Sequence, residues 1–170
     1  HWVGVHIIAP TLRDSRYDNP TSPADVYVMD PLELKQVGTT EVRVTRLGLG
    51  GAALGGLFTD VPEAAAVETV TAGLEMGVKY FDTAPLYGHG KSEAYVGKAL
   101  GAVPRDSFVL SSKVGRVLNR VDSQGDTDIY FGLPPFEAVF DFSRDGILRS
   151  IDESLERLGL DRIDIAFIHD

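Results

Sequence analysis

The sequence predicts an α/β protein built around a parallel sheet, and three features of the pattern lead to this prediction. Short apolar runs typical of strands recur along the chain, segments with apolar residues at helical spacing lie between them, and a glycine follows each helical segment. Strands and helices that alternate at this spacing indicate right-handed crossovers, which set neighbouring strands parallel. The pattern leaves two architectures open, a doubly wound open sheet and a closed barrel.

Several short segments have the composition of strands. Residues 40–46 alternate in polarity and predict a short strand or hairpin arm that closes the floor of a barrel. Leu47–Gly51 predicts a short strand that ends in a glycine-rich turn. The remaining predicted strands are the apolar runs 78–81, 107–112 and 163–168. Runs of this kind are typical of strands buried in a parallel sheet.

Helical segments separate these strands. The first begins at Asp60 and Glu63, which flank Pro62 and form a helix-start signal in which we expect a carboxylate to accept hydrogen bonds from unpaired backbone N–H groups, and it ends at Gly77. The second covers Ser92–Leu100. The third is the clearest, because the apolar residues of Ile147–Leu158 fall on one face. We expect Gly159 to end this helix in the left-handed conformation.

Residues 1–36 differ from the rest of the chain. They carry several prolines among Asp, Asn, Ser and Thr residues and show neither a helical nor a strand period. We expect these residues to form an irregular, poorly ordered N-terminal extension. Residues 37–170 are then the folded domain.

Length and composition narrow the classes of function. The chain has 170 residues, whereas an eight-stranded β/α barrel usually needs about 250. The net charge of −9 argues against nucleic acid and anionic membrane as partners, because both would be repelled. No apolar run is long enough to predict a membrane span. The absence of cysteine excludes disulfides and cysteine-bound metals and fits a cytoplasmic location.

Ionisable side chains fall where the predicted strands end. Asp82, Lys113 and His169 each follow a predicted strand. Tyr87 lies in the loop just beyond Asp82. In a parallel barrel the C-terminal ends of all strands open on one face, where active sites are built. We therefore expect these four side chains to converge.

The chemistry of these side chains assigns a role to each. A free tyrosine has a pKa of about 10 and exchanges its proton poorly near neutrality. An ammonium group such as that of Lys113 favours the phenolate form of Tyr87, which allows proton exchange with a substrate oxygen. Asp82 is suited to hold Lys113 in place, and His169 to donate a hydrogen bond to the same oxygen. None of these groups accepts a hydride, so a redox reaction needs an organic cofactor.

Each of the four residues alone has a plain structural explanation. Asp82 can start a turn, and Tyr87 can pack as an ordinary loop aromatic. Lys113 and His169 can be solvated residues at strand ends. Their shared position at consecutive strand ends is what favours catalysis over these explanations.

Four segments resemble a known family. Lys79–Glu93, which reads KYFDTAPLYGHGKSE, closely resembles the signature of the aldo-keto reductases. Ser111–Gly115 and Phe167–Asp170 resemble the lysine and histidine segments of that family, and Leu47–Gly51 resembles its first strand and turn. The resemblance covers residues 37–170.

The resemblance implies a (β/α)8 TIM barrel, of which the first four β/α units, a half barrel, are present here. It implies that a carbonyl and an alcohol of a small molecule are interconverted with NAD or NADP as the cofactor and without a metal. It places the catalytic tetrad, with Tyr87 as general acid/base, at Asp82, Tyr87, Lys113 and His169. The cofactor-binding residues that it implies in this chain are Gly50, Gly51, Ala52 and Asp82.

Two segments resemble one branch of this family more narrowly. Asp82–Gly90 and Asp126–Phe131 are similar to the branch that contains L-fucose and D-threo-aldose 1-dehydrogenases and pyridoxal 4-dehydrogenase. Members of that branch oxidise a cyclic hemiacetal to a lactone with NAD as the acceptor. The narrower resemblance therefore implies a sugar or a pyridoxal-like substrate.

A long segment without a clear pattern separates Lys113 from the third predicted helix. It holds about thirty residues, whereas loops of more than about 15 are uncommon and are often functional. Its aromatic and acidic residues are Tyr130, Phe131, Phe136, Phe140 and Phe142 among Asp122, Asp126, Asp128 and Asp141. One interpretation is a lid over the substrate, suited to a hydroxylated ring. The other is an excursion whose aromatic side chains pack on the rim of the barrel.

Three hypotheses about function follow. The first is that the parent protein is an oxidoreductase and that this chain, which starts without Met and stops at Asp170, is a fragment inactive on its own. The second is a non-enzymatic, nucleotide-binding regulatory subunit on the reductase fold, against which the complete tetrad argues. The third is an open-sheet α/β protein whose polar strand ends coincide by chance.

Overall fold

The computed structural model describes residues 29–169, and the extension predicted for residues 1–36 lies mostly outside this range. The strands are β1 (Leu34–Gln36), β2 (Arg43–Thr45), β3 (Leu49–Gly50), β4 (Tyr80–Asp82), β5 (Val109–Val114), β6 (Arg116–Arg120), β7 (Phe136–Phe140) and β8 (Ile165–Ile168). The helices are α1 (Glu63–Glu75), α2 (Lys91–Leu100) and α3 (Arg144–Leu158), with short 3-10 helices at Ala53–Gly55 and Arg105–Ser107. No helix in this range is long and apolar enough to cross a membrane.

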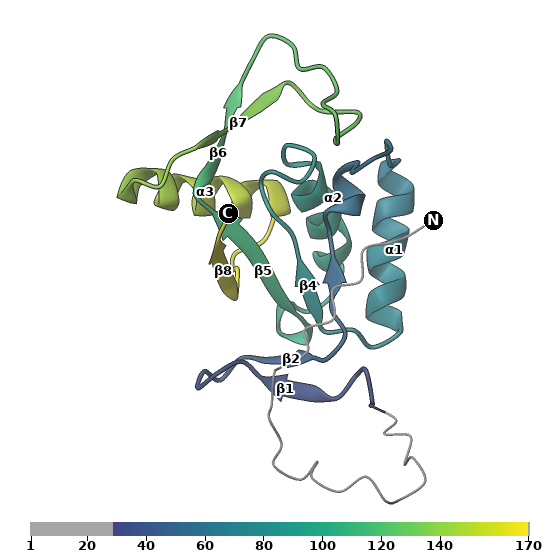
Figure 1. The fold of residues 1–170 in the computed structure, drawn as a ribbon. Helices are drawn as coiled ribbons and strands as arrows, with labels where there is room; N and C mark the ends of the chain where they lie inside the picture. The colour runs from purple at the N-terminus through teal and green to yellow at the C-terminus, as the bar shows by residue number, and fades with distance from the viewer. Residues whose placement is uncertain (1–28, 170) are drawn as a thin grey trace, which may run out of the picture.

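The centre of the fold is a four-stranded parallel sheet with the strand order β3-β4-β5-β8 (Figure 1). In its register Leu49 lies opposite Phe81, and Phe81 lies opposite Leu110. Lys113 lies opposite Phe167. The parallel strands follow one another in chain order, without the reversal that defines a doubly wound sheet. The predicted α/β fold is confirmed, and its strand order is that of one half of a (β/α)8 barrel.

The three α-helices pack on one face of this sheet (Figure 1). Successive side chains of a strand point to opposite faces, so Phe81 and Leu110 meet the helices while Asp82 and Ser111 face away. The buried core between sheet and helices contains Ala66 and Val70 of α1, Val96, Ala99 and Leu100 of α2, and Leu158 of α3. The face of the sheet that meets the helices is therefore mainly apolar, and the opposite face carries polar side chains such as Asp82 and Ser111.

The first strand, β1, lies on the N-terminal side of the predicted domain boundary at residue 37. It pairs antiparallel with β2, with Lys35 opposite Val44. Regular structure therefore begins earlier than the pattern indicated, because a three-residue strand is too short to show a period. The hairpin lies at the N-terminal end of β4, where Thr45 Oγ accepts a hydrogen bond from the Lys79 backbone N–H at 3.0 Å. The hairpin arm predicted at residues 40–46 is confirmed.

Two loop predictions differ from the structure. α1 begins at Glu63, where the helix start was predicted, but without a side-chain cap, so the predicted carboxylate cap is wrong. Asp60 Oδ1 instead accepts a hydrogen bond from Lys91 Nζ at 2.7 Å, which lowers the pKa of this carboxyl. The long segment after Lys113 is also more regular than predicted, because β6 and β7 form an antiparallel hairpin with Leu118 opposite Ala138. A long connection between these strands removes the short turn signal by which hairpins are found in sequences.

A charged network is buried between the helices and the sheet. Glu93 of α2 is fully buried and accepts hydrogen bonds from Ser112 Oγ of β5 and Arg157 Nε of α3, both at 2.7 Å. A buried charge is stable only when it is paired and hydrogen-bonded. The network therefore fixes the positions of α2, α3 and β5 relative to one another.

We expect Arg157→Ala to lower the free energy of unfolding by about 3 kcal/mol or more, because it leaves the carboxylate of Glu93 buried without its cation. Lys98→Ala is the matched control, since Lys98 pairs with Glu63 in a solvent-exposed salt bridge. Its expected cost is below about 1 kcal/mol. Urea unfolding of both variants measures these values, and similar losses in the two would contradict a structural role for the buried pair.

Candidate active site

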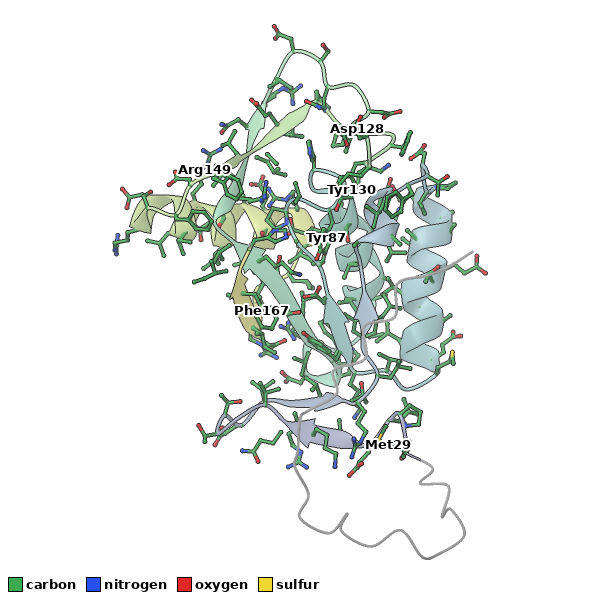
Figure 2. All side chains as sticks on the ribbon, in the orientation of Figure 1. Met29, Tyr87, Asp128, Tyr130, Arg149 and Phe167 are labelled. Carbon is green, nitrogen blue, oxygen red and sulfur yellow. The ribbon has the colours of Figure 1, made fainter. Side chains whose placement is uncertain are left out.

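The four predicted catalytic residues converge at the C-terminal ends of the parallel strands. Asp82 ends β4, Lys113 lies near the end of β5, and His169 directly follows β8. Tyr87 reaches the same place from the loop between β4 and α2, and Figure 2 shows it above the strands of the sheet. The sheet register brings these elements side by side, because β4 pairs with β5 and β5 pairs with β8.

An ion pair between Asp82 and Lys113 forms the base of the site. Lys113 Nζ donates hydrogen bonds to Asp82 Oδ2 at 2.7 Å and to the Thr83 backbone carbonyl at 3.0 Å. The two charged side chains are mostly buried, with 14% of Lys113 and 21% of Asp82 exposed. Reduced contact with water strengthens such a charge-assisted pair. Asp82 therefore fixes the position of the ammonium group, as the sequence predicted.

Two residues that the sequence analysis missed support Asp82: one bonds to its other oxygen, and the second contacts the first. Ser111 Oγ donates a hydrogen bond to Asp82 Oδ1 at 2.6 Å, and the Tyr80 hydroxyl lies 3.1 Å from Ser111 Oγ. Ser111 stands two residues before Lys113 and Tyr80 stands two before Asp82. Side chains two apart on a strand share a face, so strand periodicity contained the signal that could have identified both.

Tyr87 lies between the cation and the imidazole. Lys113 Nζ is 4.7 Å from the centroid of the Tyr87 ring. The ring of His169 lies 5.8 Å away, centroid to centroid, and perpendicular to the ring of Tyr87. His169 is buried, whereas Tyr87 is only half-buried. The half-buried phenol therefore has both a positive charge and an imidazole as near neighbours.

A pocket of about 280 Å³ opens beside these residues. It is lined by Gly48, Leu49, Gly50, Tyr80, Asp82, Tyr87, Lys113 and Phe167. Figure 2 shows Phe167 on β8, below Tyr87. Polar groups thus occupy part of the pocket wall, and glycine backbone and apolar side chains form the rest.

The predicted cofactor-binding residues lie in two environments. Gly50 and Asp82 line the pocket. Gly51 is buried in the packing next to it, where its N–H donates to the Asp82 backbone carbonyl at 2.7 Å. A Cβ atom on Gly51 would lie 2.4 Å from Ser92 Oγ, so only glycine fits there. Ala52 is half-buried and stands next to the 3-10 helix Ala53–Gly55.

The long segment after β5 was predicted to be either a lid over the substrate or an excursion with aromatic side chains packed on the barrel rim. As a whole it agrees with neither prediction. Phe140 and Phe142 are exposed and stack on each other at the base of the hairpin, with the guanidinium of Arg116 3.8 Å from the Phe140 ring centroid. Its acidic residues Asp122, Asp126 and Asp128 are exposed, and Asp141 accepts hydrogen bonds at the start of α3. Only Tyr130 among the segment's aromatic residues is buried.

The buried Tyr130 has an unusual titration. Burial, and to a smaller extent the nearby Tyr87, raise the pKa of Tyr130 to about 12, whereas Arg116 acts in the opposite direction. Burial likewise raises the pKa of Tyr80. Both phenols therefore keep their protons near neutral pH and act as hydrogen-bond donors there.

The site is suited to proton transfer. Within residues 29–169 no group of three or more His, Asp and Glu side chains is placed to hold a metal ion. A phenol beside an ammonium group and an imidazole can exchange a proton with an oxygen of a bound molecule. The same side chains have no means of accepting a hydride, so a redox reaction at this site needs an organic cofactor.

Comparison with known proteins agrees with this geometry. Residues 46–170 match the model of the Aldo/keto reductase family. The chain belongs to this family. The enzymes of this family use NAD(P) as their cofactor.

Two similar proteins are sugar and pyridoxal dehydrogenases. The chain is 40% identical over 154 residues to pyridoxal 4-dehydrogenase from Microbacterium luteolum, which covers 81% of this chain and 43% of that protein. It is 44% identical over 132 residues to D-threo-aldose 1-dehydrogenase from a Pseudomonas species, which covers 75% of this chain and 40% of that protein. The chain therefore spans less than half the length of these relatives.

A solved structure gives the same fold. An aldo-keto reductase from Bacillus halodurans in its holo form superposes with a TM-score of 0.61 at 33% identity. The match covers 79% of this chain and 39% of that protein. The four parallel strands and their helices thus correspond to part of the (β/α)8 barrel of the family.

The raised pKa of Tyr130 gives stability a pH dependence at alkaline pH. The folded state keeps the Tyr130 proton up to about pH 12, whereas the unfolded state releases it near pH 10. Between these values the unfolded state binds fewer protons, so the free energy of unfolding falls as the pH rises. We expect Tyr130→Phe to lose less stability than the wild type across this window, measured by urea unfolding at several pH values. Equal losses in both proteins would contradict the raised pKa.

Proposed function

We propose that this chain carries the proton-transfer residues of an NAD(P)-dependent oxidoreductase that interconverts a carbonyl and an alcohol. The observation that carries the proposal is the placement of Tyr87 between Lys113, 4.7 Å from its ring centroid, and the perpendicular ring of His169. Tyr87 is the general acid/base of the proposal. Membership in the aldo-keto reductase family supports it.

Each side chain of the site has its own role in proton transfer. The ammonium group of Lys113 stabilises negative charge on the oxygen of Tyr87, so that this oxygen can release and take up a proton. Asp82 holds the ammonium group in place by accepting its hydrogen bond at 2.7 Å, and Ser111 holds Asp82 by donating to its other oxygen at 2.6 Å. His169 borders the same phenol and orients the substrate oxygen that shares a proton with it.

The residues of the pocket fit a nicotinamide cofactor. Gly48 and Gly50 expose backbone without side chains, which allows a flat ring to approach, and Asp82 and Lys113 supply polar partners at the same wall. During alcohol oxidation the carbon loses a hydride, for which NAD(P)+ is the acceptor, and the hydroxyl loses a proton, which Tyr87 takes up. Gly50 and Asp82 are the residues of this chain that we propose to lie against the cofactor.

The proposed substrate is a small cyclic hemiacetal, either a sugar or a pyridoxal-like compound, that is oxidised to a lactone. Identities of 40% to pyridoxal 4-dehydrogenase and 44% to D-threo-aldose 1-dehydrogenase support this choice. Both relatives are much longer than this chain, so the proposal concerns the complete gene product.

We expect Tyr87→Phe in the complete gene product to lower kcat by about 100-fold or more, because it removes the proton donor and little volume. Absorbance of the reduced cofactor, with NAD or NADP against L-fucose, related aldoses and pyridoxal, measures this. The matched control is Tyr95→Phe on α2, which removes a hydroxyl away from the site and should leave kcat unchanged. Nucleotide binding without turnover of any of these compounds would contradict the proposal and favour a regulatory subunit.

We also expect the 170-residue chain alone to show no turnover. The edge strands β3 and β8 have no further partner strand within residues 29–169, and Phe167 and Ile168 of β8 are exposed. Open edges favour association over a closed active site. Steady production of NADH by the isolated chain would contradict this prediction.

A further inference from the structure

Three loops meet where α2 begins, and the side chain of Lys91 joins them. Lys91 is the first residue of α2 and directly follows the loop of Tyr87. Its Nζ donates hydrogen bonds to Asp60 Oδ1 at 2.7 Å, in the loop after β3, and to the Phe131 carbonyl at 3.2 Å, in the loop between β6 and β7. These contacts of Lys91 with Asp60 and Phe131 are called the Lys91 junction below.

The position of this lysine is unfavourable for α2 itself. The N-terminus of a helix carries partial positive charge, so an anion is preferred there and a cation is destabilising. Only 11% of the Lys91 side chain is exposed, although 63% of the side chain of Asp60 is. A mostly buried ammonium group depends on its acceptors. The reason for a lysine at this position therefore lies in the two loops that it binds, and not in the helix that it begins.

Backbone pairing holds the same two loops together. The Phe58 N–H donates to the Ile129 carbonyl at 2.7 Å, and the Phe131 N–H donates to the Gly56 carbonyl at 3.0 Å. Phe58 has a φ of 64°, which is uncommon for a bulky residue and costs free energy. The loop after β3 keeps this conformation because the contacts around it compensate for the strain.

The backbones around Lys91 are so close that only glycine fits at two positions. A Cβ atom on Gly56 would lie 2.5 Å from the Phe131 carbonyl oxygen. A Cβ atom on Gly132 would lie 2.3 Å from Asp60 Oδ1 and 2.9 Å from Lys91 Nζ. Both glycines also have positive φ, 96° and 64°. The two loops are therefore packed backbone to backbone around the ammonium group.

The loop after β3 is also in direct contact with the backbone of Tyr87. A Cβ atom on Gly55 would lie 2.5 Å from the carbonyl carbon of Tyr87, and a Cβ atom on Gly88 would lie 1.9 Å from the Gly55 carbonyl oxygen. The carbonyl of Tyr87 accepts a hydrogen bond from the Ser92 N–H at 3.2 Å. The backbone of Tyr87 is thus fixed from two directions, by the loop after β3 and by the first turn of α2.

We propose that Lys91 is a positioning residue, which holds the loop after β3 in the place that sets the phenol of Tyr87 beside Lys113 and His169. The inference rests on the proposed function, in which Tyr87 exchanges a proton with the substrate. Lys91 does not line the pocket of the site, so its effect passes through the backbone contact between Gly55 and Tyr87. Proton transfer requires close alignment, and a small displacement of the phenol lowers kcat.

The test is Lys91→Met in the complete gene product, which keeps the apolar part of the side chain and removes its charge. We expect kcat to fall about tenfold, with the KM values for substrate and cofactor nearly unchanged. Lys98→Met is the matched control, since it removes the exposed lysine of a salt bridge on the same helix and should leave kcat unchanged. An unchanged kcat in Lys91→Met, or an equal loss in Lys98→Met, would overturn the proposal.

A double-variant cycle with Asp60→Asn tests whether the effect passes through the junction. We expect Asp60→Asn to lower kcat by a smaller factor, and the double variant to lose no more than Lys91→Met alone, because both changes remove the same ion pair. Losses that multiply, as for independent sites, would overturn the proposal.

Amide hydrogen exchange separates this inference from the proposed function. We expect residues 54–60, 84–90 and 127–132 to exchange about tenfold faster in Lys91→Met, at an unchanged urea midpoint of unfolding. This pattern in a protein that turns over none of the compounds would support the junction and reject the proposed reaction. Turnover with unchanged exchange of residues 84–90 would overturn the inference and leave the reaction standing. A lower urea midpoint with faster exchange along the whole chain would overturn it too, because Lys91 would then serve global stability alone.

Discussion

The hydrogen bonds of Asp82 are the constraint on which the site depends, because they tie three strands together at their C-terminal ends. Its backbone carbonyl accepts from the Gly51 N–H at 2.7 Å, next to β3. Its two carboxylate oxygens accept from Ser111 and Lys113, both on β5. One residue thus joins the glycine turn to the lysine that borders Tyr87. A shift of the register of β4 by one residue would turn Asp82 toward the helices and dismantle all of these contacts at once.

β5 serves both faces of the sheet through the alternation of its side chains. Ser111 and Lys113 face the site, whereas Ser112 between them bonds to the buried Glu93 on the helix side. The pair of Glu93 with Arg157 holds α2 and α3 against this strand. The loop of Tyr87 leads directly into α2, so packing on the helix face also sets where the phenol lies. The packing of the helices and the position of the site residues therefore both depend on β5.

The β6–β7 hairpin extends the site beyond the tetrad. Its acidic residues are exposed and Phe140 stacks on Phe142 beyond β7, whereas Tyr130 is buried and its pKa is raised. Two phenols with different surroundings then lie close together. Tyr87, beside the cation of Lys113, is suited to exchange a proton, and the buried Tyr130 keeps its proton near neutral pH.

The sequence by itself determined the alternation of strands and helices, the end of α3 at Gly159 in the left-handed conformation, and the types of residue at the strand ends. These features depend on local periods and on motifs, which short segments contain in full. Only the tertiary structure decided that Asp60 pairs with Lys91, that Ser111 and Tyr80 support Asp82, and that Tyr130 lies beside Tyr87. Each of these contacts joins residues far apart in the chain. Local periodicity records which face a side chain occupies but not which distant segment packs against that face.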